Sequence, residues 1–393
     1  MEIAGRAVDP RRLLTPGKIL IGIILLGGII LTVKRFAFGL GATTNLSDQF
    51  PWGLWIGFDV ISGVALAAGG FTMAFLVHIF LDDFYRPLVR PAILTAFLGY
   101  LLVIVGLLFD LGKPWNIWHA IFWWNPHSAM FEVAWCVMLY TSVLFLEFLP
   151  MVFERFRAKK AMRIIRIFQI PIFIAGIVLS TLHQSSLGSL FLLMPSKLHP
   201  LWYTPYLPLL FFFSAVTVGF AMVIVESFLS SRFLNHGLRI ELLARLGRYL
   251  AFANLVYLVL RFQDLFARGQ LGRIFAGEYE SYFFIAEILL FLVPLLILLS
   301  GRLRHSRGGL FAAALMVVLG LVLNRINVAI VGFTRSVGGA YFPNWQEIWV
   351  SVFLVVSAAL VFGLAARYLP VFSHGPEGVG EGDEEMAPVS ASV

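Results

Sequence analysis

The sequence is poor in charge and in cysteine. Charged residues make up 13% of its 393 positions, against roughly 25% in ordinary soluble domains, so a soluble globular protein is excluded. The single cysteine, Cys136, excludes a disulfide framework, a cysteine-ligated iron–sulfur cluster and covalently attached haem, because these need more than one. Phosphate loops, dinucleotide fingerprints and zinc-ligand spacings are also missing from the sequence. No resident metal is therefore expected.

Apolar residues dominate what is present. They make up 60% of the chain, with 15% aromatic residues, and they recur in runs of about 20 residues, the length that crosses a bilayer as a helix. The sequence thus predicts an all-α polytopic membrane protein with about ten transmembrane helices. The expected spans are 18–37, 52–80, 90–110, 128–150, 164–190, 206–230, 247–267, 280–301, 309–333 and 346–369.

These spans define a single ten-helix transmembrane domain over residues 18–370. A short cytoplasmic segment, 1–17, precedes it, and its basic start leads into a full-length span without a signal-peptide cleavage pattern. The last segment, 371–393, is rich in glycine, proline and acidic residues, so we expect a disordered acidic cytoplasmic tail.

Lysine and arginine gather in alternate loops. About 20 of the 29 lie on one side of the expected spans, and the positive-inside rule makes that side cytoplasmic, together with both termini. The expected location is the cytoplasmic (inner) membrane. The net charge of +7 does not indicate nucleic acid, since the basic residues follow the loops and form no stripe.

Three ionisable residues are expected at one depth, in the outer third of the membrane. A rise of about 1.5 Å per residue places Asp59 and Glu132 roughly 10 Å below the outer surface, and His183 near the outer end of its helix. A charge inside a membrane is costly unless paired or solvated, so such residues are functional-site hypotheses by default. Each could be structural alone, but their convergence favours function, with Gln184 and Asn125 bordering the layer.

Two further polar sets are expected. The first lies at the cytoplasmic ends of the same helices, where solvated residues are ordinary: His78, Asp82, Asp83, Tyr85, Arg86 and Glu147. The second lies towards the outer side of the second half and is best interpreted as a structural set in which arginines neutralise acids: Arg261, Asp264, Glu287, Asn324, Arg325 and Asn327.

The histidines argue against haem. A transmembrane b-type haem usually needs two axial histidines at one depth on facing helices. His78 lies at the inner end of its helix and His183 at the outer end of its own, so they cannot ligate one iron. His127 with His183 is the remaining pair near one level, and it is a weak candidate.

Three long motifs resemble the NrfD/PsrC superfamily of quinone-interacting membrane subunits. They are TTNLSDQFPWGLWIGFDVISGVALAAGGF (43–71), GKPWNIWHAIFWWNPHSAMFEVAW (112–135) and STLHQSSLGSLF (180–191). Within that superfamily the chain is most similar to the HybB-like integral membrane subunits of hydrogenase-2-type Ni,Fe hydrogenases, over nearly its whole length.

The resemblance implies a subunit without haem or metal that binds menaquinone or ubiquinone near the periplasmic face. Electrons would come from an extracytoplasmic ferredoxin-like iron–sulfur subunit, itself joined to hydrogenase small and large subunits. Glu132, in the SAMFEVAW motif, matches the glutamate associated with proton transfer. The expected catalytic residues are thus Glu132, Asp59 and His183. The expected quinone-binding residues are His183, Gln184, Asp59, Asn125 and Trp135.

The residues suit this chemistry. Quinone reduction takes two electrons and two protons, and desolvated carboxylates and histidines can carry or donate those protons. The expected proton path contains Glu132, Glu147, His78, Asp82, Tyr85 and Arg86. Two alternatives stay open: a cofactor-free membrane anchor for an extracytoplasmic oxidoreductase, and a proton-coupled secondary transporter with its site near the midplane.

Overall fold

The computed structural model describes residues 15–80, 82–234, 237–338 and 341–372. Over these ranges the chain is helical without strands, and ten helical segments are long and apolar enough to cross a membrane. The predicted all-α, multi-pass membrane protein is confirmed. The spans are Pro16–Phe38, Trp55–His78, Asp83–Asp110, Ala129–Arg155, Gln169–Leu192, Leu207–Leu234, Ile240–Ala267, Tyr279–Leu299, Arg307–Val337 and Trp345–Tyr368.

Seven spans are single helices, and the other three are built from shorter segments or carry a short extension. The single ones are α2 (Pro16–Phe38), α7 (Ala129–Arg155), α9 (Gln169–Leu192), α10 (Leu207–Leu234), α11 (Ile240–Ala267) and α12 (Tyr279–Leu299), followed near the end of the chain by α16 (Trp345–Tyr368). The second span consists of η2 (Trp55–Ser62), α3 (Gly63–Leu66) and α4 (Gly69–His78). The third is η3 (Asp83–Tyr85) with α5 (Arg86–Asp110), and the ninth is α14 (Arg307–Ile326) with η6 (Asn327–Val331) and α15 (Gly332–Val337).

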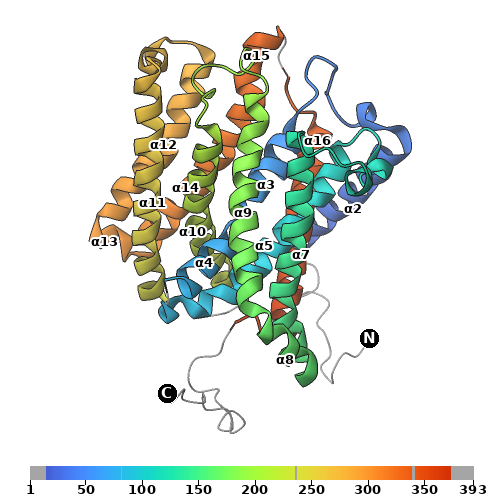
Figure 1. Cartoon of the computed structure of the whole chain (residues 1–393), viewed down its shortest axis with the longest axis vertical. Helices are drawn as coiled ribbons and strands as arrows, with labels where there is room; N and C mark the ends of the chain where they lie inside the picture. Colours follow the sequence, from blue (N-terminus) through green and yellow to red (C-terminus); the bar gives the residue numbers. More distant parts are fainter. Residues whose placement is uncertain (1–14, 81, 235–236, 339–340, 373–393) are drawn as a thin grey trace.

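Most spans pack into two groups of four. The first group contains the η2–α3–α4 span with α5, α7 and α9, and the second contains α10, α11, α12 and α14. Helix α10 joins them by packing against α9 and α4. Figure 1 shows the second group on one side and α7 with α2 on the other. Both groups bury polar residues between their helices, so each is a candidate location for a functional site.

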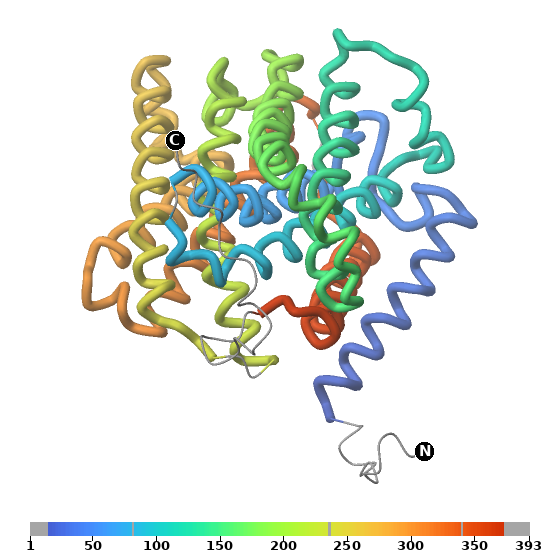
Figure 2. The backbone as a smooth tube through the Cα atoms, turned by 60° about the horizontal axis from the view of Figure 1, so that its bottom comes forward, coloured from blue at the N-terminus to red at the C-terminus, as the bar shows by residue number. Residues whose placement is uncertain are grey.

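Helices α2 and α16 form a separate pair along one edge. They pack against each other, and α16 also contacts α5. Both are largely exposed, with only 17% of their most apolar stretch buried, and Figure 2 shows α2 running along the outside of the molecule. Since their free surfaces are apolar, they face lipid. This edge encloses the cavity described below.

Local sequence explains where several helices begin. Ser128 caps α7 by accepting from the Phe131 backbone N–H. Asn344 and Glu347 form a capping box at the start of α16. The predicted fifth span, 164–190, is wrong at its start, because the basic segment forms its own helix, α8 (Lys159–Ile167), and α9 begins only at Gln169.

Two π-helical segments face each other between the groups. They are η2 and η6, and a Cβ on Gly57 of η2 would lie 3.4 Å from the Ala329 side chain of η6. Such π-helical turns occur often at functional sites because they redirect side chains. In η2 the redirected residues include Asp59.

The positions of the first and last helices are consistent with an even number of spans. Helix α2 begins and α16 ends at the same end of the bundle (Figure 1). Which end faces the cytoplasm stays a prediction from the basic residues. Most of the expected N-terminal segment (residues 1–14) and of the expected acidic tail (373–393) lies outside the described residues.

Candidate functional site

Asp59 is a buried carboxylate with only half of its hydrogen-bonding capacity used. It is 1% exposed, and its Oδ2 accepts a hydrogen bond of 2.6 Å from the Ser351 hydroxyl of α16. Its Oδ1 is buried without a partner. Helix α5 approaches closely at Gly106, where a Cβ would lie 2.9 Å from the Asp59 Cβ. Among the described residues this carboxyl oxygen therefore has no hydrogen-bond donor.

Asp59 lies in the wall of a large cavity. The cavity has a volume of about 1460 Å³ and runs between α2, the η2–α3 segment, α5, α10 and α16. Its lining is mainly apolar, and it reaches the C-terminal ends of α10 and α16. A second buried acid in the wall, Glu226, accepts from the Ser230 hydroxyl at 2.9 Å. Sequence analysis missed Glu226, although an acid inside an apolar span was a sufficient signal.

His183 lies on the other side of α5. It is fully buried, its Nδ1 is 2.9 Å from the Tyr100 hydroxyl, and its Nε2 is buried without a partner. The Tyr100 ring packs edge-on against Tyr140 of α7, with ring centroids 4.7 Å apart. The Tyr140 hydroxyl lies beside that of Ser180, although within the described residues neither has a partner at full hydrogen-bond geometry.

This row of polar side chains continues along one face of α9. Residues 173, 176, 180 and 183 recur at spacings of three and four, which places them on one side of a helix. The Glu147 Oε1 occupies the space beside Gly176, 2.9 Å from where a Cβ would be. The His78 ring stacks on Phe173 with centroids 3.9 Å apart. We call this row the α9 ladder: His183, Tyr100, Tyr140, Ser180, Glu147 and His78.

The ladder covers about 15 Å along α9, from ten residues at 1.5 Å each. Glu147 is partly buried inside its span and makes no hydrogen bond within the described part of the chain. The two tyrosines and Ser180 were not predicted, because buried tyrosines in apolar spans are ordinarily core residues. The spacing of Ser180 and His183 on one helix face was the signal that could have found them.

The predicted single cluster of Asp59, Glu132 and His183 does not form. Helix α5 separates Asp59 from His183, because Gly99 and Leu102 face the cavity while Tyr100 faces His183. In the described ranges no hydrogen bond or ion pair joins any two of the three predicted residues. The nearest connection is Gln184, whose Nε2 donates to the Val64 carbonyl at 3.0 Å, about one and a half turns from Asp59.

Glu132 is not buried inside the bundle. Because α7 begins at Ala129, Glu132 lies in the first helical turn, and its side chain is exposed on this chain. A carboxylate in the first turn is favourable beside the helix N-terminus. The expectation of an acid buried within the bundle at this position is therefore not met, and a role of Glu132 in proton transfer stays a prediction.

Trp135, in the second turn of α7, and Asn125, in the aromatic loop before that helix, do not line the cavity. The Trp135 indole donates to the Ala120 carbonyl at 2.9 Å and its ring lies 4.5 Å from that of Trp124. Asn125 is exposed in the same loop.

The predicted inner set is only partly brought together. His78 and Glu147 meet α9 within about one helical turn. Asp82 instead caps the next turn by accepting from the Phe84 backbone N–H at 3.3 Å. Tyr85 is buried with its ring against Tyr249. The remaining residue, Arg86, is exposed and pairs with Asp83 at 3.0 Å.

The second group holds a satisfied carboxylate, Glu287. Trp202, Asn324 and Asn327 each donate to it at 2.8 Å, and Arg261 lies 4.0 Å away. The predicted neutralisation of Glu287 by an arginine is thus confirmed. Arg325 bonds to Asn324, Ser214 and the Phe211 carbonyl.

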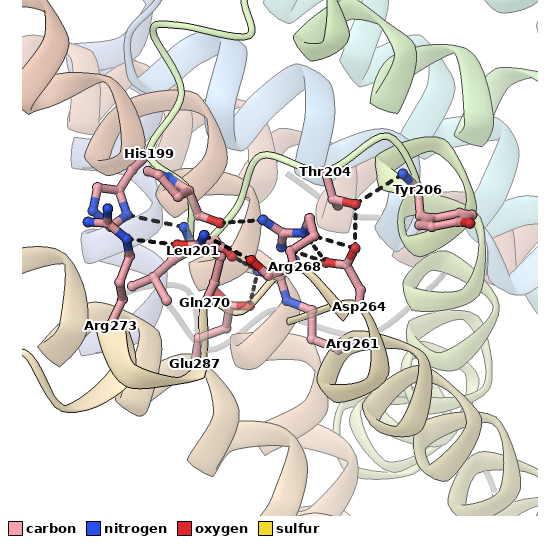
Figure 3. A network of polar contacts seen from close by, with 11 residues as sticks. His199, Leu201, Thr204, Tyr206, Arg261, Asp264, Arg268, Gln270, Arg273 and Glu287 are labelled. Atoms are coloured by element: carbon pink, nitrogen blue, oxygen red, sulfur yellow. Dashed lines mark hydrogen bonds and ion pairs between the residues drawn. The ribbon is translucent and has the colours of Figure 1, made fainter. Parts of the chain in front are cut away.

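Asp264 uses a different partner from those predicted. It pairs with Arg268 at 2.6 Å and accepts from Thr204 at 2.6 Å. Figure 3 shows Arg268 and Thr204 converging on Asp264, with Arg261 turned towards Leu201. Arg268 lies four residues beyond Asp264, so the ordinary helical ion-pair spacing would have identified it.

A third cluster lies beside this network in the loops. The ligand atoms of His199, Glu278 and Glu280 lie within 4.8 Å of one another. The His199 Nδ1 accepts from the Leu201 backbone N–H at 3.3 Å, so in the neutral ring Nε2 carries the proton and has no lone pair for a metal. Arg335 also binds Glu278 at 3.0 Å and lowers the pKa of that carboxyl. Burial lowers the pKa of His199. These residues do not fit a metal ion.

Comparison with known proteins identifies relatives along nearly the whole chain. A protein of Nitratidesulfovibrio vulgaris (strain Hildenborough) is 38% identical over 93% of this chain and 97% of its own length. The "Probable Ni/Fe-hydrogenase 2 b-type cytochrome subunit" of Escherichia coli K12 is 36% identical over 87% of this chain and 89% of its own. The "Menaquinone reductase, integral membrane subunit" of N. vulgaris is 29% identical over 89% and 90%.

One of these names refers to a b-type cytochrome, which is a haem protein. In this chain His78 contacts α9 at Phe173, ten residues and about 15 Å along the helix from His183, so the two cannot share an iron. His127 is exposed in the outer loop, whereas His183 is buried among α5, α7 and α9. These histidines do not fit a haem held by two axial imidazoles.

The family is settled by the extent of the match. The sequence model described as "Polysulphide reductase, NrfD" matches residues 42–337. This range contains η2 with Asp59, the whole α9 ladder and the Glu287 network. The full-length relatives agree with it. The chain belongs to the NrfD family of polytopic membrane proteins.

Proposed function

We propose that this chain is the quinone-reactive membrane subunit of a respiratory oxidoreductase, most simply of the hydrogen:quinone type. Two relatives support the class, one named as a subunit of a Ni/Fe hydrogenase and one as the membrane subunit of a menaquinone reductase. The first is 36% identical to this chain. The hydrogenase-type complex is therefore the better starting hypothesis.

The observation that carries the proposal is the cavity with Asp59 in its wall. Pockets for compact ligands measure roughly 300–1,000 Å³, whereas this cavity measures about 1460 Å³ and is mainly apolar. Such a space suits a molecule with a long hydrocarbon tail and a small polar ring. The ring lies near the unpartnered Oδ1 of Asp59, where a protonated carboxyl donates to a quinone oxygen and a carboxylate accepts from a quinol.

Protons reach the ring from the other side of α5 along the α9 ladder. Glu147 and His78 receive them at the inner end, and the hydroxyls of Tyr140 and Tyr100 lead to His183. His183 then rearranges or passes the proton on through water, because no hydrogen bond in the described ranges joins it to Asp59. Each quinone takes up two protons and two electrons and leaves as quinol.

The electrons come from a partner. We propose an extracytoplasmic, ferredoxin-like iron–sulfur subunit that docks on the outer loops and is joined to hydrogenase small and large subunits. The exposed aromatic residues of those loops provide a contact surface of the kind found in protein interfaces. They are Trp115, Trp118, Phe122, Trp123 and Trp124. Glu132, exposed beside this surface, exchanges protons with the outer solution.

Photolabelling of the intact complex tests the site. A quinone analogue with a photoactivatable ring is bound to the purified membrane complex, and the labelled peptides are mapped by mass spectrometry. We expect label in the η2, α5 and α16 segments, competed away by menaquinone. Label confined to the lipid-facing surfaces of α7 or α12 would contradict the assignment. A purified chain without an iron–sulfur partner would instead favour a transporter.

A passive anchor is distinguished by function. Active complex is placed in proteoliposomes, and hydrogen oxidation is followed with an artificial dye and with a quinone, together with the internal pH. The proposal predicts that quinone reduction takes its protons from the side of Glu147. If the complex reduces the dye but not the quinone, the chain would be a passive membrane anchor.

A further inference from the structure

Helix α8 is a short amphipathic helix at one end of the molecule. It connects α7 to α9 and projects below them in Figure 1. Ala161, Ile164, Ile165 and Phe168 follow the i, i+3, i+4, i+7 pattern of one helix face. Ile164 and Phe168 are 59% and 55% exposed, whereas Ala161 and Ile165 are half-buried, so this face is only partly covered by the rest of the chain.

The opposite face is basic and has no counter-charge. Between residues 155 and 166 all the charged side chains are cations, all exposed, and within the described ranges they make no ion pair and no side-chain hydrogen bond: Arg155, Arg157, Lys159, Lys160, Arg163 and Arg166. The nearest acid in the sequence, Glu154, is already paired with Arg90 at 2.7 Å. Six like charges so close together repel one another unless an anion is present.

We propose that α8 binds the anionic phospholipids of the membrane surface, with its apolar face among the acyl chains and its cations on the headgroup phosphates. An amphipathic helix with lysine and arginine on its polar face and apolar residues opposite lies in the plane of the interface. Anionic lipids are attracted by each such cation near the surface. Both halves of this arrangement have exposed side chains on α8.

A lipid explains the surface better than the acidic tail of the chain does. The segment 373–393 could neutralise the cations, but its sequence is rich in glycine and acid and supplies little to cover Ile164 and Phe168. A bilayer surface satisfies both faces at once. The consequence for the α9 ladder is local, because α8 joins the two helices, α7 and α9, that carry Tyr140, Glu147 and His183.

The test titrates the intact purified chain in detergent with phosphatidylglycerol or with phosphatidylcholine of the same acyl chains. Bound lipid is counted by native mass spectrometry. We expect tighter binding of phosphatidylglycerol to the unaltered chain. Lys160→Gln with Arg163→Gln should weaken it about 25-fold, at about fivefold for each cation lost. The matched control is Arg302→Gln with Arg307→Gln, which removes two exposed cations from the loop and helix start between α12 and α14, and it should change the affinity less than twofold.

Further variants keep the outcome clear. Ile164→Ser with Phe168→Ser should weaken both lipids together, since the apolar face does not distinguish headgroups. Unaltered elution and thermal midpoint confirm that each variant is folded. Equal losses of phosphatidylglycerol affinity in the α8 variant and the control variant would overturn the proposal. The overall positive charge of the surface would then explain the binding without a site on α8. A lipid preference that emerges only when the chain ends at Phe372 would assign the surface to the tail and overturn it too.

Discussion

Two buried carboxylates, Glu287 in the second helix group and Asp59 in the first, are hydrogen-bonded to different extents. In the second group Glu287 receives three hydrogen bonds and has Arg261 at 4.0 Å. In the first group Asp59 keeps one oxygen without a donor, and Glu147 has no hydrogen bond in the described part of the chain. A fully bonded acid holds helices together, whereas a partly bonded one is available to a ligand or a proton. For Glu287 and Asp59, the number of hydrogen bonds to the carboxylate therefore accompanies a structural role in the first case and the proposed chemical role in the second.

The largest expected effect tests the structural side. Glu287→Gln places an amide where two or more N–H donors converge and leaves Arg261 without its counter-charge. Breaking a buried pair in this way costs about 3–5 kcal/mol. Thermal unfolding in detergent should show a large loss of the folded chain. A thermal midpoint within a degree or two of that of the unaltered protein would contradict a structural role for Glu287.

The same chemical change in the first group should spare the fold and remove the activity. Asp59→Asn keeps an acceptor for Ser351 but cannot exchange a proton, and general acid–base groups contribute about 10²–10⁴-fold. We expect quinone-linked turnover to fall at least 100-fold while dye-linked hydrogen oxidation is retained. Asp48→Asn, on an exposed outer loop, is the matched control. Dye and quinone activities falling together would indicate a docking defect.

The ladder predicts a smaller effect. Tyr140→Phe removes a hydroxyl that makes no hydrogen bond, so stability should change little. Proton uptake during quinone reduction should slow about tenfold, in the range of one lost relay group. Tyr206→Phe, at an exposed ring, serves as the control. Unchanged uptake with Tyr140→Phe would remove α9 from the proton path.

Substitution of Glu132 tests whether the role expected from the sequence or the exposed position seen in the structure is the better guide to its function. A desolvated relay acid at this position predicts loss of quinone turnover in Glu132→Gln. An exposed first-turn carboxylate predicts a decrease of about threefold or less, because water can replace a solvated group. Steady-state turnover with a quinone, at equal dye activity, decides between the two. A hundredfold decrease would restore the sequence-based interpretation.

The smallest effect concerns His199 in the second half. Burial lowers the pKa of this residue, so the unfolded chain binds a proton more readily than the folded one below about pH 6.5. Stability should therefore fall as the pH drops from 7 towards 5. Thermal midpoints over this range should fall less in His199→Gln. Equal pH dependence in the two proteins would show that other groups are responsible.

Much of the fold could be predicted from the sequence. Long apolar runs locate the spans because a bilayer admits few alternatives to a helix. Counting along each helix also placed Asp59 and His183 near one another in depth. It could not give rotation about the helix axis, and Asp59 and His183 consequently lie on opposite sides of α5. Glu132 was misplaced because a shift of a few residues in the start of α7 decides whether an acid is buried. Tyr100 and Tyr140 were missed because the sequence shows a polar face on α9, through the spacing of Ser180 and His183, but not which side chains of α5 and α7 pack against it.

The π-helical segment η2 has a further consequence for how the site is specified. A π-helical turn carries one residue more than an α-helical turn. Deleting one residue from η2 would turn the preceding part of the span by about 100° relative to α3 and α4. The Trp55 indole donates to the Glu347 carbonyl at 3.2 Å. After the deletion, the segment would keep either this hydrogen bond or the present direction of the Asp59 carboxyl, but not both. The direction of the Asp59 carboxyl thus depends on the number of residues in the π-helical turn. A turn with one residue fewer would still contain Asp59, but its carboxyl would point in a different direction.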